Sequence, residues 1–289
     1  MTDRVVKGLR DRLEEGSVLE FVASDTVLSK IEKHLSGGEV KPAIPKRAAT
    51  VMLLREAEAD FEVFMMRRAS TMEFVPDAVV FPGGSVDALD YGACPWHGPA
   101  PSVWAAAIGC DEDTASAVVV AAVRELFEEC GVLLASHGDL RLLDTEEIAA
   151  CQEARKRLVK HEDSLVAFLK ERGLVLRADL LGLQSRWTTP EYENRRYDTC
   201  FFVARIPAGQ CALGDSSESS GSAWVRPSDV LSMADQGKAR VLPPTVSNLS
   251  ALTRVSDVQD LLTVGKVPSV MLRPAMREDG VVVMRSVVG

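Results

Sequence analysis

The chain has 289 residues, a formal net charge of −9, 46% hydrophobic residues and 26% charged residues. This composition excludes an intrinsically disordered protein, and the acidic balance argues against a general attraction to nucleic acid or anionic lipid. No apolar stretch approaches the roughly 20 residues that span a bilayer, and the charged N-terminus lacks a signal-peptide profile. We therefore expect a cytoplasmic protein, and its six cysteines, without a C-x-x-C pair, predict reduced thiols.

The first third of the chain predicts an arm followed by strands. Residues 1–46 form an expected N-terminal helical arm, with an amphipathic stretch from Val18 to His34. The apolar, β-branched runs Ala48 to Leu54 and Phe61 to Arg67 predict a hairpin. A short strand, Val79 to Phe81, leads into a Pro-Gly-Gly corner.

The amino-acid composition changes over residues 85–112, and this stretch is predicted to be an inserted loop. This stretch is rich in proline and glycine and contains Trp96 and Trp104. Long loops in compact domains are often lids over a site, whereas two tryptophans favour an insertion packed on a core. The sequence leaves both interpretations open.

A helix is predicted next, capped by Asp113 or Thr114. Its apolar positions repeat at i, i+3, i+4 and i+7, which predicts one buried face. Gly131 suits the left-handed position just beyond a helix end. The buried stripe consists of Val119, Ala122, Val123 and Leu126.

The remainder of the chain alternates between helices and strands. The predicted strands are Val132 to Ala135, Leu180 to Trp187, Tyr197 to Ile206, Ala223 to Val225, and a late pair at Val270 to Leu272 and Val281 to Met284. The predicted helical regions are Glu146 to Arg172, Ser228 to Gln236 and Val246 to Leu262. Such alternation predicts an α/β fold.

Three glutamates share one face of the central helix. Glu125, Glu128 and Glu129 stand at i, i+3 and i+4, which places their side chains together. Two like charges about 4 Å apart repel by roughly 4 kcal/mol at an effective dielectric near 20, and a divalent cation turns that repulsion into attraction. Carboxylate oxygens favour Mg²⁺ or Mn²⁺ over zinc. A glutamate-rich helix alone is usually a solvated face, so the flanking residues decide the interpretation.

Those flanking residues resemble the box of the Nudix hydrolases. That box is written G, five residues, E, seven residues, then R-E-U-x-E-E-x-G-U, where U is a bulky apolar residue. Gly84 matches the opening glycine, and the second half is matched throughout. The matching residues of the second half are Arg124, Glu125, Leu126, Glu128, Glu129, Gly131 and Val132.

The first half of the box departs from the pattern. In an uninterrupted box the arginine follows the glycine by fourteen residues, but Arg124 follows Gly84 by 124 − 84 = 40, so 40 − 14 = 26 residues are inserted. Counting eight residues back from Arg124 reaches Ser116, where the first box glutamate is expected. We expect this carboxylate to be missing or replaced by a neighbouring acid. The candidates are Asp111, Glu112 and Asp113.

An interrupted box is similar to one branch of the family, the peroxisomal coenzyme A diphosphatases and their bacterial relatives. The resemblance implies an α/β/α sandwich with a mixed sheet, extended by an N-terminal arm, the box insertion and helical additions. We expect a Nudix domain over residues 47–265, with the box insertion at 85–112, a helical insert at 144–172 and a C-terminal segment at 266–289. Further matches are Arg67-Arg68, Trp187-Thr188-Thr189-Pro190, Arg195-Arg196-Tyr197-Asp198-Thr199 and Pro243-Pro244-Thr245.

The resemblance also implies roles for individual residues. Glu125, Glu128 and Glu129 hold the metal, with the Gly83 carbonyl as a further ligand, and Arg124 orients Glu128 across one helical turn. One of these glutamates, or Glu218 as a loop carboxylate near the metal, takes the proton; the alternative for Glu218 is a surface acid. The expected substrate-binding residues, with a surface role as the alternative for the last two, are Arg67, Arg68, Gly84, Arg195 and Arg196.

The expected activity is Mg²⁺- or Mn²⁺-dependent cleavage of coenzyme A or acyl-coenzyme A into adenosine 3′,5′-bisphosphate and 4′-phosphopantetheine or its acyl form. NADH or ADP-ribose is the alternative substrate, and a non-catalytic nucleotide sensor with the same fold is the alternative of another class. The expected partner is a small nucleotide, not nucleic acid or a membrane, and the sequence leaves a homodimer open.

Overall fold

The computed structural model describes residues 18–36, 42–57, 61–68, 77–213, 219–255, 257–267 and 269–287. Its helices are α2 (Asp25–Ser36), α3 (Pro101–Ile108), α4 (Glu112–Cys130), α5 (Thr145–Ala149), α6 (Gln152–Val159), α7 (Leu165–Glu171), α8 (Pro227–Asp235) and α9 (Pro243–Leu252), with 3-10 turns η1 (Ala88–Asp90), η2 (Ala178–Leu180) and η3 (Val258–Leu261). Its strands are β1 (Val18–Val22), β2 (Lys46–Glu56), β3 (Phe61–Arg68), β4 (Val79–Val80), β5 (Gly83–Ser85), β6 (Trp96–His97), β7 (Ala135–Ser136), β8 (Val175–Arg177), β9 (Leu181–Thr188), β10 (Tyr197–Arg205), β11 (Ser219–Val225), β12 (Ser269–Val270), β13 (Arg273–Met276) and β14 (Val282–Val287).

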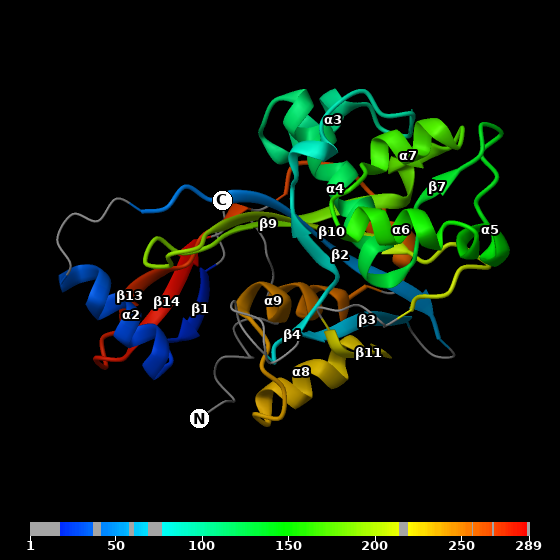
Figure 1. The fold of residues 1–289 in the computed structure, drawn as a ribbon. Helices are drawn as coiled ribbons and strands as arrows, with labels where there is room; N and C mark the ends of the chain where they lie inside the picture. The colour runs from blue at the N-terminus through cyan, green and yellow to red at the C-terminus, as the bar shows by residue number, and fades with distance from the viewer. Residues whose placement is uncertain are drawn as a thin grey trace.

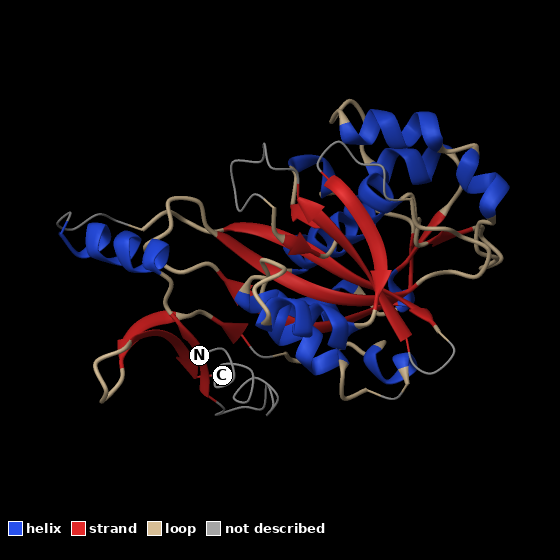
Figure 2. Ribbon diagram, turned by 90° about the horizontal axis from the view of Figure 1, so that it is seen from below, coloured by secondary structure: helices blue, strands red, loops and turns tan. Residues whose placement is uncertain are grey.

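A mixed central sheet forms the middle layer of the molecule (Figures 1 and 2). Its strand order is β11-β3-β2-β10-β9-β12, with β4 added to β3 and β5 added to β2. The β2–β10 pair is parallel, whereas β2–β3 and β9–β10 are antiparallel. The predicted α/β fold with a mixed sheet is confirmed, as is the hairpin of β2 and β3.

Side-chain alternation along β2 divides the core between the two faces of this sheet. Ala49, Val51 and Leu53 belong to a hydrophobic cluster with the central helix α4, whereas Met52 and Leu54 belong to a second cluster with α9. Successive side chains of a strand point to opposite faces, so one strand contributes to both cores. The first cluster fixes α4 against the sheet.

The first and last described segments form one small sheet, which Figure 1 shows beside the central sheet. Strand β1 pairs antiparallel with β14, which pairs in turn with β13. The predicted helix from Val18 to His34 is therefore wrong over its first residues, because Leu19 and Phe21 alternate with exposed Val18 and Val22 as a strand against β14 requires. The helix itself begins at Asp25.

Other boundaries also differ from the predictions. Helix α4 is capped by Asp111, whose side chain accepts hydrogen bonds from the Thr114 amide (2.8 Å) and hydroxyl (2.7 Å), so the predicted caps lie in its first turn. The strand predicted from Val132 is observed only at Ala135–Ser136. The helix predicted from Val246 to Leu262 is divided into α9 and η3.

The box insertion packs on the core. Trp104 in α3 is fully buried, with its ring 5.8 Å from that of Phe202. The half-buried Trp96 donates its indole N–H to the Pro99 carbonyl at 2.8 Å. These contacts support an insertion packed on the core and not a lid.

Gly131 lies in the left-handed region with φ 70°, as predicted, and ends α4. Within the described ranges, no helix has the length and apolarity that crossing a membrane requires.

Gly182 in β9 provides a test of this packing. A Cβ atom there would lie 1.8 Å from the Leu261 carbonyl oxygen, so the backbones of β9 and η3 must separate to accept alanine. We expect Gly182→Ala to lower the free energy of unfolding by about 1–3 kcal/mol, the usual cost of overpacking. Gly265→Ala, where a Cβ meets open space, should unfold with wild-type stability. Equal chemical denaturation midpoints for the two variants would contradict the close contact between Gly182 and Leu261.

Candidate functional site

Arg124 is the centre of a buried ionic cluster. Its Nε and Nη2 donate to the two carboxylate oxygens of Asp90 at 2.8 and 3.0 Å. Its Nη1 donates to Glu125 Oε1 at 2.8 Å and to Glu128 Oε2 at 3.2 Å. The Ser85 carbonyl accepts a further hydrogen bond from Nη2 at 3.0 Å. The predicted contact between Arg124 and Glu128 is present, together with partners that the helix alone does not provide.

Asp90 takes the place expected for the first box glutamate. It lies six positions after Gly84 (84 + 6 = 90), which is the spacing of an uninterrupted box. Its side chain is fully buried. The expectation of Ser116, or of an acid beside it, was wrong because the inserted residues lie after this position. Counting forward from Gly84, in place of backward from Arg124, would have found it.

The β5 corner lies directly against the glutamates of α4. The Gly83 amide donates to Glu129 Oε2 at 2.7 Å. A Cβ on Gly84 would lie 2.3 Å from Glu125 Oε1. Only glycine leaves room for the Glu125 carboxylate at this approach. The structure therefore brings together four of the predicted site residues from β5 and α4.

Burial makes the Glu125 and Glu128 carboxylates reluctant to ionise. Burial raises the pKa of Glu125 to about 7, with Glu128 adding to the shift and Arg124 opposing it. Burial also raises the pKa of Glu128 against the effect of Arg124. Burial disfavours the charge of Arg124 too, but Asp90 and the glutamates more than compensate and raise its pKa. Additional positive charge beside Glu125 and Glu128 would favour their ionised forms.

The donor set fits a hard divalent cation. In the part of the chain that is described, no three His, Cys, Asp or Glu side chains converge as a preformed metal site. Arg124 Nη1 is hydrogen-bonded to both Glu125 and Glu128. Glu128 Oε1 is nevertheless buried, with no hydrogen-bond partner among the described residues. An unsatisfied buried carboxylate oxygen is costly, and a cation beside it would remove that cost.

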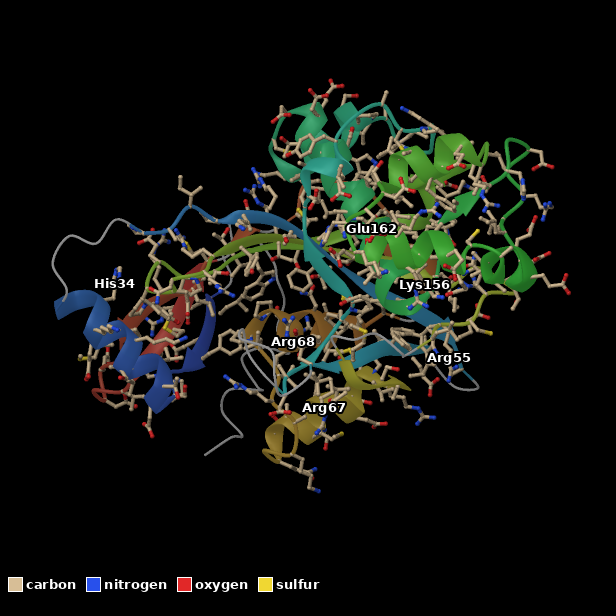
Figure 3. The ribbon with its side chains drawn as sticks, in the orientation of Figure 1. His34, Arg55, Arg67, Arg68, Lys156 and Glu162 are labelled. Atoms are coloured by element: carbon tan, nitrogen blue, oxygen red, sulfur yellow. The ribbon has the colours of Figure 1, made fainter. Side chains whose placement is uncertain are left out.

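A cavity of about 1520 Å³ opens beside the cluster. Among the predicted substrate-binding residues, Arg68 and Gly84 line it. Figure 3 labels Arg68, on β3, and Lys156, on α6, which also lines the cavity. Arg67 is exposed and does not line it, because adjacent side chains of a strand point to opposite faces.

The other two predicted arginines do not line this cavity. Arg196 is buried and donates to the backbone carbonyls of Thr189 (3.0 Å) and Ala43 (2.8 Å), so the structure assigns it to holding the chain together. Arg195 is exposed and does not line the cavity. Glu218 lies outside the described residues.

Arg155 is a site residue that the sequence reasoning missed. This buried side chain donates from Nε to the Glu128 carbonyl at 3.1 Å. A cation beside the last turn of a helix also interacts favourably with its dipole. Arg155 thus joins α6 to the end of α4 that carries the glutamates, and no local pattern in the sequence indicates this long-range contact.

The comparisons with known proteins match this site. The family model described as the NUDT19 Nudix domain covers residues 106–252. Acyl-coenzyme A diphosphatase NUDT19 of Xenopus laevis is 23% identical over 238 residues, and the human protein of that name is 26% identical over 240. Each alignment covers 70% of this chain, and 62% and 63% of the relative, so this chain corresponds to less than two thirds of either relative.

A solved structure has the same fold. The NUDIX hydrolase from Alicyclobacillus acidocaldarius superposes with a TM-score of 0.64 at 29% sequence identity. The match covers 78% of this chain and 98% of that one. Together with the family model, which covers half of the chain, it shows that this protein belongs to the Nudix hydrolase family, in the group defined by the NUDT19 Nudix domain.

Proposed function

We propose that this protein hydrolyses the diphosphate of coenzyme A or acyl-coenzyme A with Mg²⁺ or Mn²⁺. The products are adenosine 3′,5′-bisphosphate and 4′-phosphopantetheine or its acyl form. Water adds its oxygen to one phosphorus, the bridging P–O bond breaks, and the two fragments leave as phosphate monoesters. The observation that carries the proposal is the buried cluster in which Glu125, Glu128 and Glu129 exceed the charge of Arg124.

The choice of substrate is supported by the relatives. Two of them, from frog and human, carry the name acyl-coenzyme A diphosphatase. Their 23–26% identity extends over 70% of this chain. The cavity is also lined by cationic side chains from separate parts of the chain, such as Arg68 and Lys160, which suit a ligand with several phosphates.

The chain's own residues provide the positioning. Glu125, Glu128 and Glu129 would hold the cation, with the Gly83 carbonyl as a further ligand. The cation, when bound, neutralises the diphosphate and acidifies water. Glu129 accepts a hydrogen bond from the Gly83 amide, so β5 contributes to the orientation of its carboxylate. We assign the proton acceptor to a carboxylate of this cluster.

A substrate panel tests the proposal directly. The purified chain would be incubated with Mn²⁺ and coenzyme A, dodecanoyl-coenzyme A, NADH or ADP-ribose, and the products identified by mass spectrometry. We expect adenosine 3′,5′-bisphosphate from the first two compounds. Faster cleavage of NADH or ADP-ribose than of the two coenzyme A compounds would show that the proposed substrate is wrong. Tight binding of a nucleotide without any cleavage would indicate a sensor.

Replacing Glu129 should separate catalysis from folding. Glu129→Gln keeps the shape of the side chain but removes a charged ligand, so we expect turnover to fall by about 10² or more. Glu112→Gln, in the exposed first turn of the same helix, is the control and should keep wild-type kcat. Thermal unfolding should confirm that both variants are folded. A wild-type kcat for Glu129→Gln would refute the proposed role of Glu129 as a ligand of the cation.

Divalent cations should stabilise the protein through Glu128. Because binding to the folded state alone adds RT ln(1 + [L]/Kd), Mn²⁺ at a hundred times its Kd should add about 2.7 kcal/mol. We expect the Tm of the chelator-treated wild type to rise on addition of Mn²⁺, and that of Glu128→Gln to rise much less. The same rise in both proteins would place the cation elsewhere.

Asp90 should be required for stability as well as turnover. Removing one partner of a buried ion pair costs about 3–5 kcal/mol, so Asp90→Asn should lower the free energy of unfolding by that amount. Asp179→Asn is a matched control, because Asp179 also holds an arginine with both oxygens (2.7 and 2.6 Å) but is 29% exposed. If urea denaturation gives equal losses for the two variants, burial of the Asp90 pair is not the dominant factor.

A further inference from the structure

The cavity beside the glutamates extends well beyond them. Its volume of about 1520 Å³ exceeds the roughly 300–1,000 Å³ of most small-ligand sites. One part is lined by the carboxylates of α4 and by Gly83 and Gly84 of β5. Another part is lined by β1, α2 and β14, the elements at the two ends of the described chain. The same space therefore joins the catalytic cluster to the small terminal sheet.

Six apolar or aromatic side chains line this second part of the cavity, beside polar ones such as Thr26 and Lys30. Phe21 of β1 and Met284 of β14 face it across their strand pair. They belong to one hydrophobic cluster with Trp187 and Phe201 of the central sheet, which also line the cavity. Val22 and Val27 extend the lining along β1 and α2. We call these six residues the terminal wall.

An ion pair joins α2, which carries part of the terminal wall, to the connection between β9 and β10. Lys30 of α2 donates to both carboxylate oxygens of Glu193, each at 2.8 Å, and both residues line the cavity. Glu193 lies in the connection between β9 and β10. The contact joins the N-terminal segment to the central sheet over a separation of 163 residues. The apolar lining is therefore fixed to the sheet that carries the site.

An elongated ligand with one polyanionic end and one apolar end complements this cavity. The carboxylate cluster, with its cation, requires the diphosphate at one end. The terminal wall presents mainly a hydrocarbon surface, on which apolar burial gains about 25 cal/mol per Å², whereas burying an unpaired polar group costs several kcal/mol. A ligand that was polar at both ends, such as a dinucleotide, would leave the terminal wall unused.

We propose that the terminal wall is the subsite for the acyl end of an acyl-pantetheine arm, and that it sets the preference of the enzyme for acyl chain length. This proposal rests on the proposed function, because the diphosphate at the glutamates defines where the arm begins. Neither β1, α2 nor β14 lies within the residues 106–252 that the family model covers. Chain-length selection would then be contributed by the two ends of this particular chain.

The test narrows the subsite without touching the catalytic cluster. Val22 lines the cavity and is 49% exposed, so Val22→Trp can reach into it without overpacking the core. Val27→Trp, from α2, is a second narrowing variant. The matched control is Val18→Trp, because Val18 lies on the same face of β1 at 52% exposure but does not line the cavity. All three proteins would first be compared with wild type by thermal unfolding.

Two measurements follow. The first is kcat/KM for coenzyme A, acetyl-coenzyme A and dodecanoyl-coenzyme A with Mn²⁺. The second is the Kd of dodecanoyl-pantetheine and of pantetheine, measured by calorimetry without metal. For Val22→Trp and Val27→Trp, we expect kcat/KM for dodecanoyl-coenzyme A, divided by kcat/KM for free coenzyme A, to fall by about tenfold or more. Both variants should bind dodecanoyl-pantetheine more weakly than wild type does. Both should cleave free coenzyme A at nearly the wild-type rate. Val18→Trp should change neither quantity.

The outcomes separate this inference from the proposed function. Cleavage of coenzyme A by wild type, with an unchanged chain-length ratio in both narrowing variants, overturns the subsite alone. Equal affinity of wild type for dodecanoyl-pantetheine and pantetheine also overturns it. If wild type cleaves the diphosphate of none of these three compounds but binds dodecanoyl-pantetheine in a manner that Val22→Trp weakens, the subsite stands and the proposed function fails.

Discussion

The buried guanidinium of Arg124 is the interaction on which the site depends. It is 4% exposed and binds Asp90, Glu125 and Glu128 at the same time. One positive charge faces three carboxylates, and Glu129 adds a fourth acid on the same turn of helix. The carboxylates therefore outnumber the positive charge of Arg124, and under the proposed function a divalent cation would balance them. In that proposal the same charges serve stability and catalysis.

The long insertion in the box is compatible with this cluster because of where it enters. Asp90 precedes the insertion and Arg124 follows it, yet the two side chains meet with both oxygens of the carboxylate at 2.8 and 3.0 Å. The inserted residues pack on the core through Trp104 and return the chain to α4 at its Asp111 cap. The chain thus forms the contact between Asp90 and Arg124 across a longer loop than an uninterrupted box has. The entropy cost of closing a loop grows only slowly with its length.

The two faces of the central sheet pack against different parts of the molecule. One face packs α4 through Ala49, Val51 and Leu53 and so holds the glutamates rigidly. The other face carries the cluster of Met52 and Leu54, and part of it is left for the cavity, which β1 and β14 close. A strand with alternating side chains serves both faces at once. The division explains how a rigid ionic site and a roomy apolar subsite exist on one sheet.

Local patterns in the sequence were enough to predict the hairpin of β2 and β3, helix α4, its end at Gly131 and the common face of Glu125, Glu128 and Glu129. These features follow from periods of two and 3.6 residues and from the conformational freedom of glycine, which act over short distances in the chain. The tertiary structure alone decided that Asp90 pairs with Arg124, that Arg155 binds the end of α4, that Arg196 binds backbone away from the cavity, and that β1 is a strand. Each of these depends on a partner 27 or more residues away or, for Arg196, on carbonyls as far as 153 residues away. Side-chain type and spacing do not specify such partners, because burial and strand pairing are properties of the folded chain as a whole.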